Sequence, residues 1–153
     1  MKLWLFLGKL AFWISWPLLY IYLGWGERTR VLVVADDHVL MVRTWLGPGR
    51  WILPGGGLHH KEAPAVGALR ELREETGVAL DQIQLQAVGL HTAHDTGIKF
   101  QYHGFVARLP QRPLIKKQLL EIAEVAWVPV DQVLADNPVQ SVRHLVALWK
   151  DRA

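Results

Sequence analysis

Apolar and polar residues follow the spacing of β-strands in several short parts of this chain. Residues 30–36 and 38–45 are two such segments, and Asp36 and Asp37 between them predict a tight turn, so we expect a hairpin. Other segments alternate apolar and polar residues or are continuously apolar over the length of a short strand. They are residues 51–53, 83–92, 98–109 and 124–130.

Two further segments carry apolar residues at the spacing of a helix. The first runs from Pro64 to Thr76, with proline in its first turn and Gly77 as a stop signal. The second covers residues 138–153. Its apolar stripe consists of Val142, Leu145, Val146 and Trp149. Strands interspersed with two helices predict an α/β protein with a mixed sheet.

Residues 1–25 form a separate apolar segment. Within residues 3–25 only Lys9, Ser15 and Pro17 interrupt the apolar run, and a helix of that length would span ~34 Å, enough to cross a bilayer. We therefore expect a single-pass membrane anchor that contacts lipid through residues 3–25, followed by one globular domain over residues 26–153. A cleaved signal peptide, a helix in the membrane plane and a helix buried against the domain or a partner are the alternatives.

The net charge of +3 comes largely from this apolar segment. Lys2 and Lys9 are two of the 17 lysines and arginines. The other 15 and all 14 acids lie in the rest of the chain, so the globular part is nearly neutral. The longest basic run is Lys116–Lys117, which argues against nucleic acid as a partner. The chain has no cysteine, which excludes disulfides, cysteine zinc sites and thiol nucleophiles.

Glu71, Glu74 and Glu75 lie within five positions of the first predicted helix. At about 100° per residue their carboxylates share one sector of the helix surface. Like charges at this spacing repel, and a bound cation would relieve the repulsion. Carboxylate oxygens favour Mg²⁺ or Mn²⁺, and the glycines at 55–57 let backbone approach such an ion or a phosphate. A solvated helix face, with Arg70 and Glu74 paired one turn apart, is the alternative that these residues leave open.

The spacing resembles the signature of the Nudix hydrolases, G-x5-E-x7-R-E-U-x-E-E-x-G-U, in which U is an aliphatic residue. Residues 56–78 fill every fixed position. These are Gly56, Glu62, Arg70, Glu71, Leu72, Glu74, Glu75, Gly77 and Val78. The segments 51–56 and 124–130 also look like the family, so the resemblance extends over residues 28–150. It implies a Nudix-type α/β/α sandwich with a mixed β-sheet, preceded here by the N-terminal hydrophobic helix.

In activity, the resemblance implies divalent-metal-dependent hydrolysis of the diphosphate linkage in a nucleoside diphosphate joined to a group X, with water as the nucleophile. The implied cofactor is Mg²⁺ or Mn²⁺. Its implied ligands are Glu71, Glu74, Glu75 and the backbone carbonyl of Gly56. The implied catalytic residues are Glu71, Glu74 and Arg70, because the arginine matches a position that orients the acids by ion pairing.

The identity of the general base stays open at this level. The resemblance places it on the signature helix, at Glu71, or in a later loop, where Glu121 and Glu124 are the candidates. Glu62 matches an outer acid that binds either the metal or Arg70.

Substrate contacts are expected from three residues near the signature. Arg43 and Arg50 carry guanidinium groups suited to a phosphate or a base, and Gly57 lets backbone approach the ligand. We expect two loop histidines to be solvated and two tryptophans to be core residues. These are His59, His60, Trp51 and Trp127.

A membrane-anchored nucleotide-binding or sensor module with this fold and no turnover is the second function that the sequence leaves open. The complete set of signature acids favours the hydrolase. The diphosphate isomerases of the family use a cysteine, and this chain has none. We expect a small-molecule diphosphate as substrate and a catalytic domain on the cytoplasmic side of a membrane; a homodimer is left open.

Overall fold

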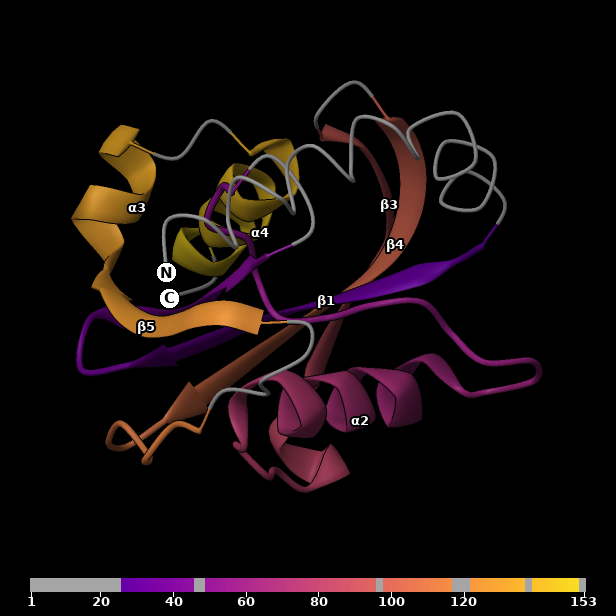
Figure 1. Cartoon of the computed structure of the whole chain (residues 1–153), viewed down its shortest axis with the longest axis horizontal. Helices are drawn as coiled ribbons and strands as arrows, with labels where there is room; N and C mark the ends of the chain where they lie inside the picture. The colour runs from indigo at the N-terminus through magenta and orange to yellow at the C-terminus, as the bar shows by residue number, and fades with distance from the viewer. Residues whose placement is uncertain (1–25, 46–48, 96–97, 117–121, 137–138, 152–153) are drawn as a thin grey trace.

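The computed structural model describes residues 26–45, 49–95, 98–116, 122–136 and 139–151 (Figure 1). The expected N-terminal hydrophobic helix, residues 1–25, lies outside these ranges. Within them, no helix has the length and apolar character needed to cross a bilayer. The membrane anchor and its lipid contacts therefore stay predictions.

The described residues form a mixed sheet in the middle of the domain (Figure 1). Its strands are β1 (Arg28–Ala35), β2 (His38–Thr44), β3 (Gln86–Asp95), β4 (Ile98–Leu109) and β5 (Ile122–Pro129). They lie in the order β3-β4-β1-β2-β5. β1 runs parallel to β4, and the other neighbours are antiparallel.

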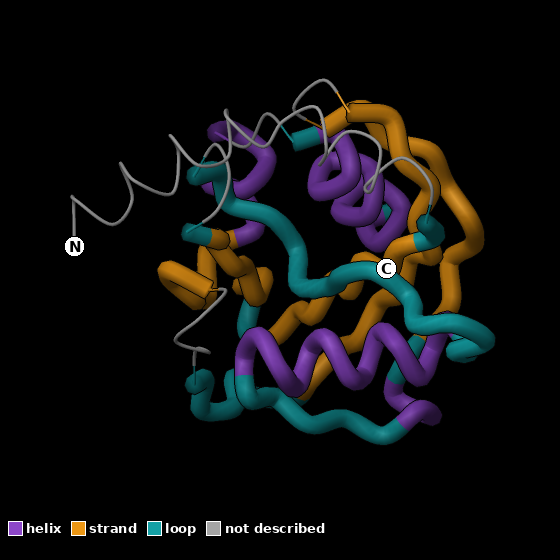
Figure 2. Tube along the Cα trace, turned by 45° about the vertical axis from the view of Figure 1, so that its right-hand side comes forward, coloured by secondary structure: helices purple, strands orange, loops and turns teal. Residues whose placement is uncertain are grey.

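Helices cover both faces of the sheet, as the predicted sandwich requires (Figure 1, Figure 2). α2 (Pro64–Thr76) covers one face and buries Ala68 and Leu72. α3 (Val130–Asp136) and α4 (Gln140–Lys150) cover the opposite face, where α4 buries Val142 and Leu145. The predicted α/β/α sandwich with a mixed sheet is confirmed.

β1 is buried on both sides because it lies at the centre of the sheet. Leu32 and Val34 join the apolar cluster on the α4 face, while Val31 and Val33 join the cluster on the α2 face. A strand covered on both faces needs apolar side chains in both directions, which explains the continuous β-branched run in its sequence.

The predicted hairpin and first helix are also confirmed. Asp36 and Asp37 have φ angles of 47° and 57°, in the left-handed region that a two-residue hairpin turn uses. Aspartate adopts this region more readily than most residues. α2 has the predicted bounds, and Gly77 ends it with φ at 73°.

The strand predicted over residues 83–92 begins too early. Gln82–Gln84 form the short 3₁₀ helix η1, and β3 starts at Gln86. The Asp81 N–H donates to the Gln84 side chain at 2.9 Å, and the Asp81 side chain accepts from the Gln84 backbone. These local bonds outweigh the apolar alternation that predicted a strand.

α3 is a helix that the sequence reading missed. The predicted strand at 124–130 is displaced: β5 covers Ile122–Pro129, and Val130 starts α3. Val130 and Val133, one turn apart, are both buried on the α4 face. A helix of 7 residues is too short for its period to stand out from strand alternation.

Candidate functional site

The segment between β2 and α2 crosses from one strand to its neighbour. Ile52 exchanges backbone hydrogen bonds with Val42 of β2, each at 2.9 Å. Further along, the Pro54 and Gly56 carbonyls accept hydrogen bonds from backbone N–H groups of β1, at 2.9 and 2.8 Å. The segment therefore lies between β1 and β2 where these strands separate, and the glycines follow directly.

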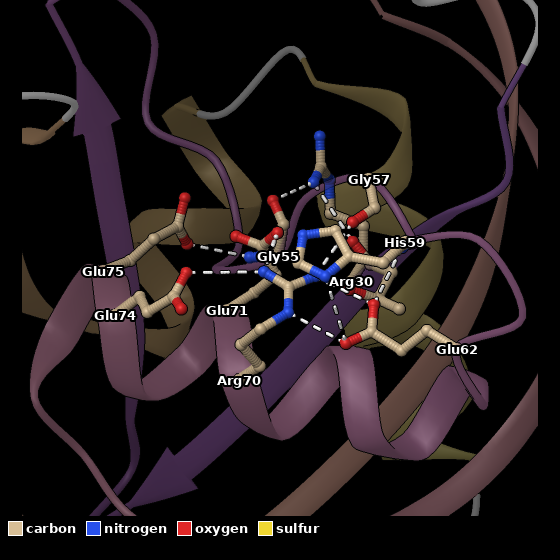
Figure 3. Close-up of polar contacts among 10 residues, drawn as sticks. Arg30, Gly55, Gly57, His59, Glu62, Arg70, Glu71, Glu74 and Glu75 are labelled. Carbon is tan, nitrogen blue, oxygen red and sulfur yellow. Dashed lines mark hydrogen bonds and ion pairs between the residues drawn. The ribbon is translucent and has the colours of Figure 1, made fainter.

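Gly55 is held by two charged side chains from opposite sides. Its N–H donates to Glu75 Oε2 at 2.8 Å, and its carbonyl accepts from Arg30 Nη1 at 2.6 Å (Figure 3). Arg30 and Glu75 are each only 7% exposed. Gly55 has φ at 136°, and a Cβ there would collide with the Thr29 carbonyl, so only glycine fits.

Sequence reasoning missed Arg30. An arginine directly before a continuous β-branched run was the available signal, because a charged residue at such a position must find partners once it is buried. Its guanidinium also lies over the Phe100 ring, 5.6 Å from the centroid.

Gly56 lies against Glu71. A Cβ at position 56 would come within 2.5 Å of the Glu71 carboxyl carbon, so glycine is what allows this carboxylate to reach the backbone of the loop. The structure thus brings together two residues that the signature assigned to one metal site. Their role as ligands stays a prediction.

Arg70 joins three of the signature acids, Glu62, Glu71 and Glu74, into one network (Figure 3). Its Nε and Nη2 donate to the two carboxylate oxygens of Glu62, each at 2.9 Å. Nη1 donates to Glu71 at 2.8 Å and to Glu74 at 3.3 Å. Nη2 also donates to the Gly57 carbonyl at 3.1 Å. All five N–H donors of the guanidinium are therefore used.

The network changes the proton affinity of its members. The pKa of Glu62 falls from 4.5 to about 2, chiefly because Arg70 hydrogen-bonds the carboxylate and secondly because the His59 N–H does so. The pKa of Arg70 rises above its ordinary value, first because of the Glu62 hydrogen bond and further because of Glu71. Both side chains are charged at neutral pH, so the ion pair is maintained there.

The charges and donor atoms of this network suit a divalent cation. One guanidinium serves three carboxylates, and Glu75 adds a fourth beside Gly55, so negative charge is in excess. The Glu74 side chain is 49% exposed, which leaves it accessible from solvent. Carboxylate oxygens are the donors that Mg²⁺ and Mn²⁺ prefer.

The carboxylates are nonetheless not clustered around a common point. In the part of the chain that the structure describes, no three His, Cys, Asp or Glu residues converge as a metal-binding group. Glu71 and Glu74 both accept from Arg70 Nη1, and Glu75 accepts from the Gly55 N–H. The glutamates have the oxygen donors that a divalent cation needs and lie close to one another. In the structure, Arg70 is the positive charge that Glu71 and Glu74 contact.

Two of the predicted substrate residues make no contact with the glutamates of the signature. Arg43, on β2, contacts Glu124 of β5 at 3.3 Å and covers the Trp51 ring. Arg50 is exposed, one residue before Trp51. Gly57, the third, lies in the network through its carbonyl. Their part in substrate binding stays a prediction.

The other residues singled out from the sequence are the candidate general bases, two loop histidines and two tryptophans. Glu121 lies outside the described residues, so the structure leaves only Glu71 and Glu124 in view as candidate bases. The side chains of His59 and His60 are exposed, as predicted. Trp51 and Trp127 are partly buried, each against a different apolar cluster.

The sequence profile of the NUDIX domain matches residues 26–148 of this chain, which is most of its length. The chain belongs to the Nudix family. The matched range starts directly after the apolar N-terminal segment, and it contains the whole site described above.

Curated relatives match part of the chain. Human diphosphoinositol polyphosphate phosphohydrolase 3-alpha is 49% identical over 43 residues, which are 28% of this chain and 26% of the relative. Nudix hydrolase 25 of Arabidopsis thaliana is 38% identical over 61 residues, 39% of this chain and 35% of the relative. The matches thus span about a quarter to a third of these relatives.

Solved structures share the fold over most of the chain. The NUDIX domain of Shewanella oneidensis NrtR, crystallised with ADP ribose, has a TM-score of 0.71 at 20% identity, covering 82% of this chain and 86% of that one. Dihydroneopterin triphosphate pyrophosphohydrolase of E. coli has a TM-score of 0.70 at 19% identity, covering 83% and 96%. At these identities the likeness shows the fold alone.

Proposed function

We propose that this Nudix protein is a divalent-metal-dependent pyrophosphohydrolase that cleaves the diphosphate linkage of a nucleoside diphosphate derivative. The observation that carries the proposal is that all four signature acids lie beside the glycine loop, three of them bonded to Arg70 and Glu75 bonded to Gly55. The names of the curated relatives, which include phosphohydrolases, support the same reaction class.

In this proposal the protein orients the carboxylates and the loop. Arg70 fixes Glu62 and Glu71 while leaving Glu74 half exposed, so the acid nearest solvent is also the least constrained. Arg30 and Glu75 hold the Gly55 peptide from its two ends. The exposed Gly57 lies on the solvent side of the loop, where a diphosphate would approach.

The residues that would hold the cofactor are Glu71, Glu74, Glu75 and the carbonyl of Gly56. Bound there, Mg²⁺ or Mn²⁺ would neutralise the diphosphate and lower the pKa of water for attack on phosphorus. Glu71, held between Gly56 and Arg70, is the candidate to accept a proton from that water.

The test is hydrolysis of a panel of diphosphate compounds with Mg²⁺ and with Mn²⁺. Wild type should convert at least one nucleoside diphosphate derivative, and EDTA should remove the activity. Glu74→Gln keeps the shape of the side chain but removes its charge, so kcat should fall about a hundredfold or more. Asp131→Asn, which alters an exposed ion pair with Lys150 on the α3 and α4 side, is the matched control and should behave as wild type.

Equal activity of wild type and Glu74→Gln would refute the proposal. If the wild type binds nucleotides in calorimetry and yields no product with either metal, the chain is a binding or sensor module instead. The same assay therefore separates the two functions that the sequence left open.

We further propose that residues 3–25 anchor this domain in a membrane, with the catalytic domain on the cytoplasmic side. The supporting observation is the length of the apolar run, which matches the hydrocarbon thickness of a bilayer. Full-length protein should sediment with membranes, and Trp13→Arg combined with Ile14→Arg, at the middle of the run, should reduce this association, since each charge costs roughly 3 kcal/mol at the bilayer centre. Unchanged sedimentation would contradict the anchor.

A further inference from the structure

A second polar group lies next to the glycine loop and outside the glutamate network. It consists of Arg43 on β2, Trp51 in the segment before the loop, and Glu124 on β5. The Arg43 guanidinium lies 4.5 Å from the centroid of the Trp51 ring, and its Nη1 lies 3.3 Å from Glu124 Oε2. We call these three residues the Arg43 group.

The Arg43 group is partly accessible, although one of its donors is buried. The Arg43 Nε is buried and has no hydrogen-bond partner among the described residues. The side chains of Arg43 and Glu124 are 27% and 35% exposed, so a ligand can reach both. The group therefore presents a donor, an acceptor and an aromatic ring side by side.

The sheet places the Arg43 group within reach of the signature. Ile52 is bonded to Val42, which sets Trp51 beside Arg43, and an extended backbone spans ~13 Å over the four steps from Trp51 to the glycine at 55. Met41 faces the α4 side of the sheet, so Arg43, two residues further, faces the same side. Arg30, which holds the Gly55 carbonyl, lies on that side too, against Phe100.

The β2–β5 register shifts between Arg43 and Thr44, directly beside this group. Such a bulge bends its strand and redirects the neighbouring side chains. Here it occurs where Arg43 pairs with Glu124 across the two strands. The pairing is thus set at an irregular strand end, a position where sheets commonly carry binding residues.

The charge of the Arg43 group indicates what it can recognise. Glu124 offsets the positive charge of Arg43, so a second polyphosphate gains little there and meets a carboxylate. A nucleobase is neutral and planar, and its edge presents donors next to acceptors. Aromatic rings and arginine guanidinium planes are both surfaces on which bases stack.

We propose that Arg43, Trp51 and Glu124 form the subsite that recognises the nucleobase of the substrate. The inference rests on the proposed hydrolysis of a nucleoside diphosphate derivative, and it deepens that function by assigning its base-binding residues. Glu124 accepts hydrogen bonds from the base edge, Arg43 donates to it, and the Trp51 ring, over which the guanidinium lies, supports the plane of the base. In this assignment Glu124 binds substrate and is not the general base.

The experiment compares kcat and KM for three kinds of probe. These are nucleoside diphosphate sugars carrying adenine, guanine, cytosine or uracil, methyl diphosphate, which has no base, and a diphosphoinositol polyphosphate. Glu124→Gln should raise KM for the preferred nucleotide about tenfold or more, with kcat changed less than about twofold. It should leave methyl diphosphate unaffected, and it should lower KM for the diphosphoinositol polyphosphate because Arg43 is no longer neutralised.

A second subsite variant and a control variant accompany Glu124→Gln. Arg43→Lys keeps the charge but loses the planar group, so it should also raise KM for the nucleotide and spare methyl diphosphate. Asp131→Asn is the ion-pair control and should match wild type for all three probes. Thermal unfolding of each variant establishes that the domain is folded.

Several results would overturn the subsite. Equal losses on the nucleotide and on methyl diphosphate would mean that Glu124 acts on the reaction itself, as would a fall in kcat with KM unchanged. A wild-type preference for the diphosphoinositol polyphosphate over every nucleotide would exclude a nucleobase subsite.

If the wild type turns over none of the probes, calorimetry separates the two proposals. Weaker binding of nucleoside diphosphates to Glu124→Gln, with inorganic pyrophosphate bound as in wild type, would support the subsite although the hydrolase proposal fails. Unchanged binding of the nucleoside diphosphates would overturn the subsite.

Discussion

Arg70 contacts the glycine loop and Arg43 contacts the segment that leads into it, and the two differ in how their hydrogen-bond donors are used. Arg70 donates all its N–H groups within the protein, to Glu62, Glu71, Glu74 and the Gly57 carbonyl. Arg43 contacts one carboxylate and one ring, and its Nε has no hydrogen-bond partner in the described part of the chain.

Arg70 thus holds several protein groups in place, whereas the partly exposed Arg43 makes fewer contacts within the protein. Around Arg70 the carboxylates outnumber the guanidinium, so the surplus negative charge suits a cation. Around Arg43 one acid balances one base, so the group suits a neutral polar ligand. The same residue type thus serves the two ends of one proposed substrate in opposite ways.

Replacing each arginine by methionine gives the largest expected contrast. Arg70→Met leaves Glu62 and Glu71 partly buried without their counter-ion, so the free energy of unfolding should fall by about 2 kcal/mol and kcat by at least about tenfold. Arg43→Met should cost less than about 1 kcal/mol, because its ion pair is more exposed. Denaturant unfolding measures the loss of stability, and steady-state kinetics measures the loss of kcat. Equal losses of stability in the two variants would contradict the difference drawn between Arg70 and Arg43.

Acid should act on the Arg70 network through Glu62. Its pKa is 4.5 when unperturbed and about 2 in the folded protein, so the unfolded chain binds the proton first as the pH falls. The stability that Glu62 contributes is therefore fully present above about pH 4.5 and is lost on acidification toward about pH 2.

In Glu62→Gln this component of the acid dependence should disappear. Denaturant unfolding at a series of pH values between about 5 and 2 measures the slope for both proteins. The variant should be less stable than wild type at neutral pH and lose less stability over this range. Parallel curves would show that the Glu62–Arg70 pair does not control the acid response.

The smallest expected effect is that of Glu124→Gln on stability. Its ion pair with Arg43 is about one third exposed on either side, and such pairs contribute roughly 0–1 kcal/mol. The melting temperature should therefore stay close to that of wild type while substrate selectivity changes. A large fall in stability would instead assign the Arg43–Glu124 pair to the fold.

Predictions from sequence succeeded where a local pattern was sufficient. Asp36 and Asp37 form the predicted turn, and α2 runs from Pro64 to Thr76 as its proline, apolar spacing and following glycine indicate. They failed where local hydrogen bonds competed with the strand pattern, and where a helix was too short for its apolar spacing to be recognised. Asp81 and Gln84 bond each other and delay β3, and α3 is shorter than the stretch needed to detect its period.

The sequence by itself determined that Glu71, Glu74 and Glu75 share one face of a helix, because helical geometry converts their spacing directly into direction. Only the tertiary structure decided which groups meet them. Arg30 and Glu75 reach Gly55 across separations of 25 and 20 residues, and Arg43 meets Glu124 only because β2 and β5 pair in that register. Such contacts depend on how strands and helices from distant parts of the chain are placed, which no local spacing encodes.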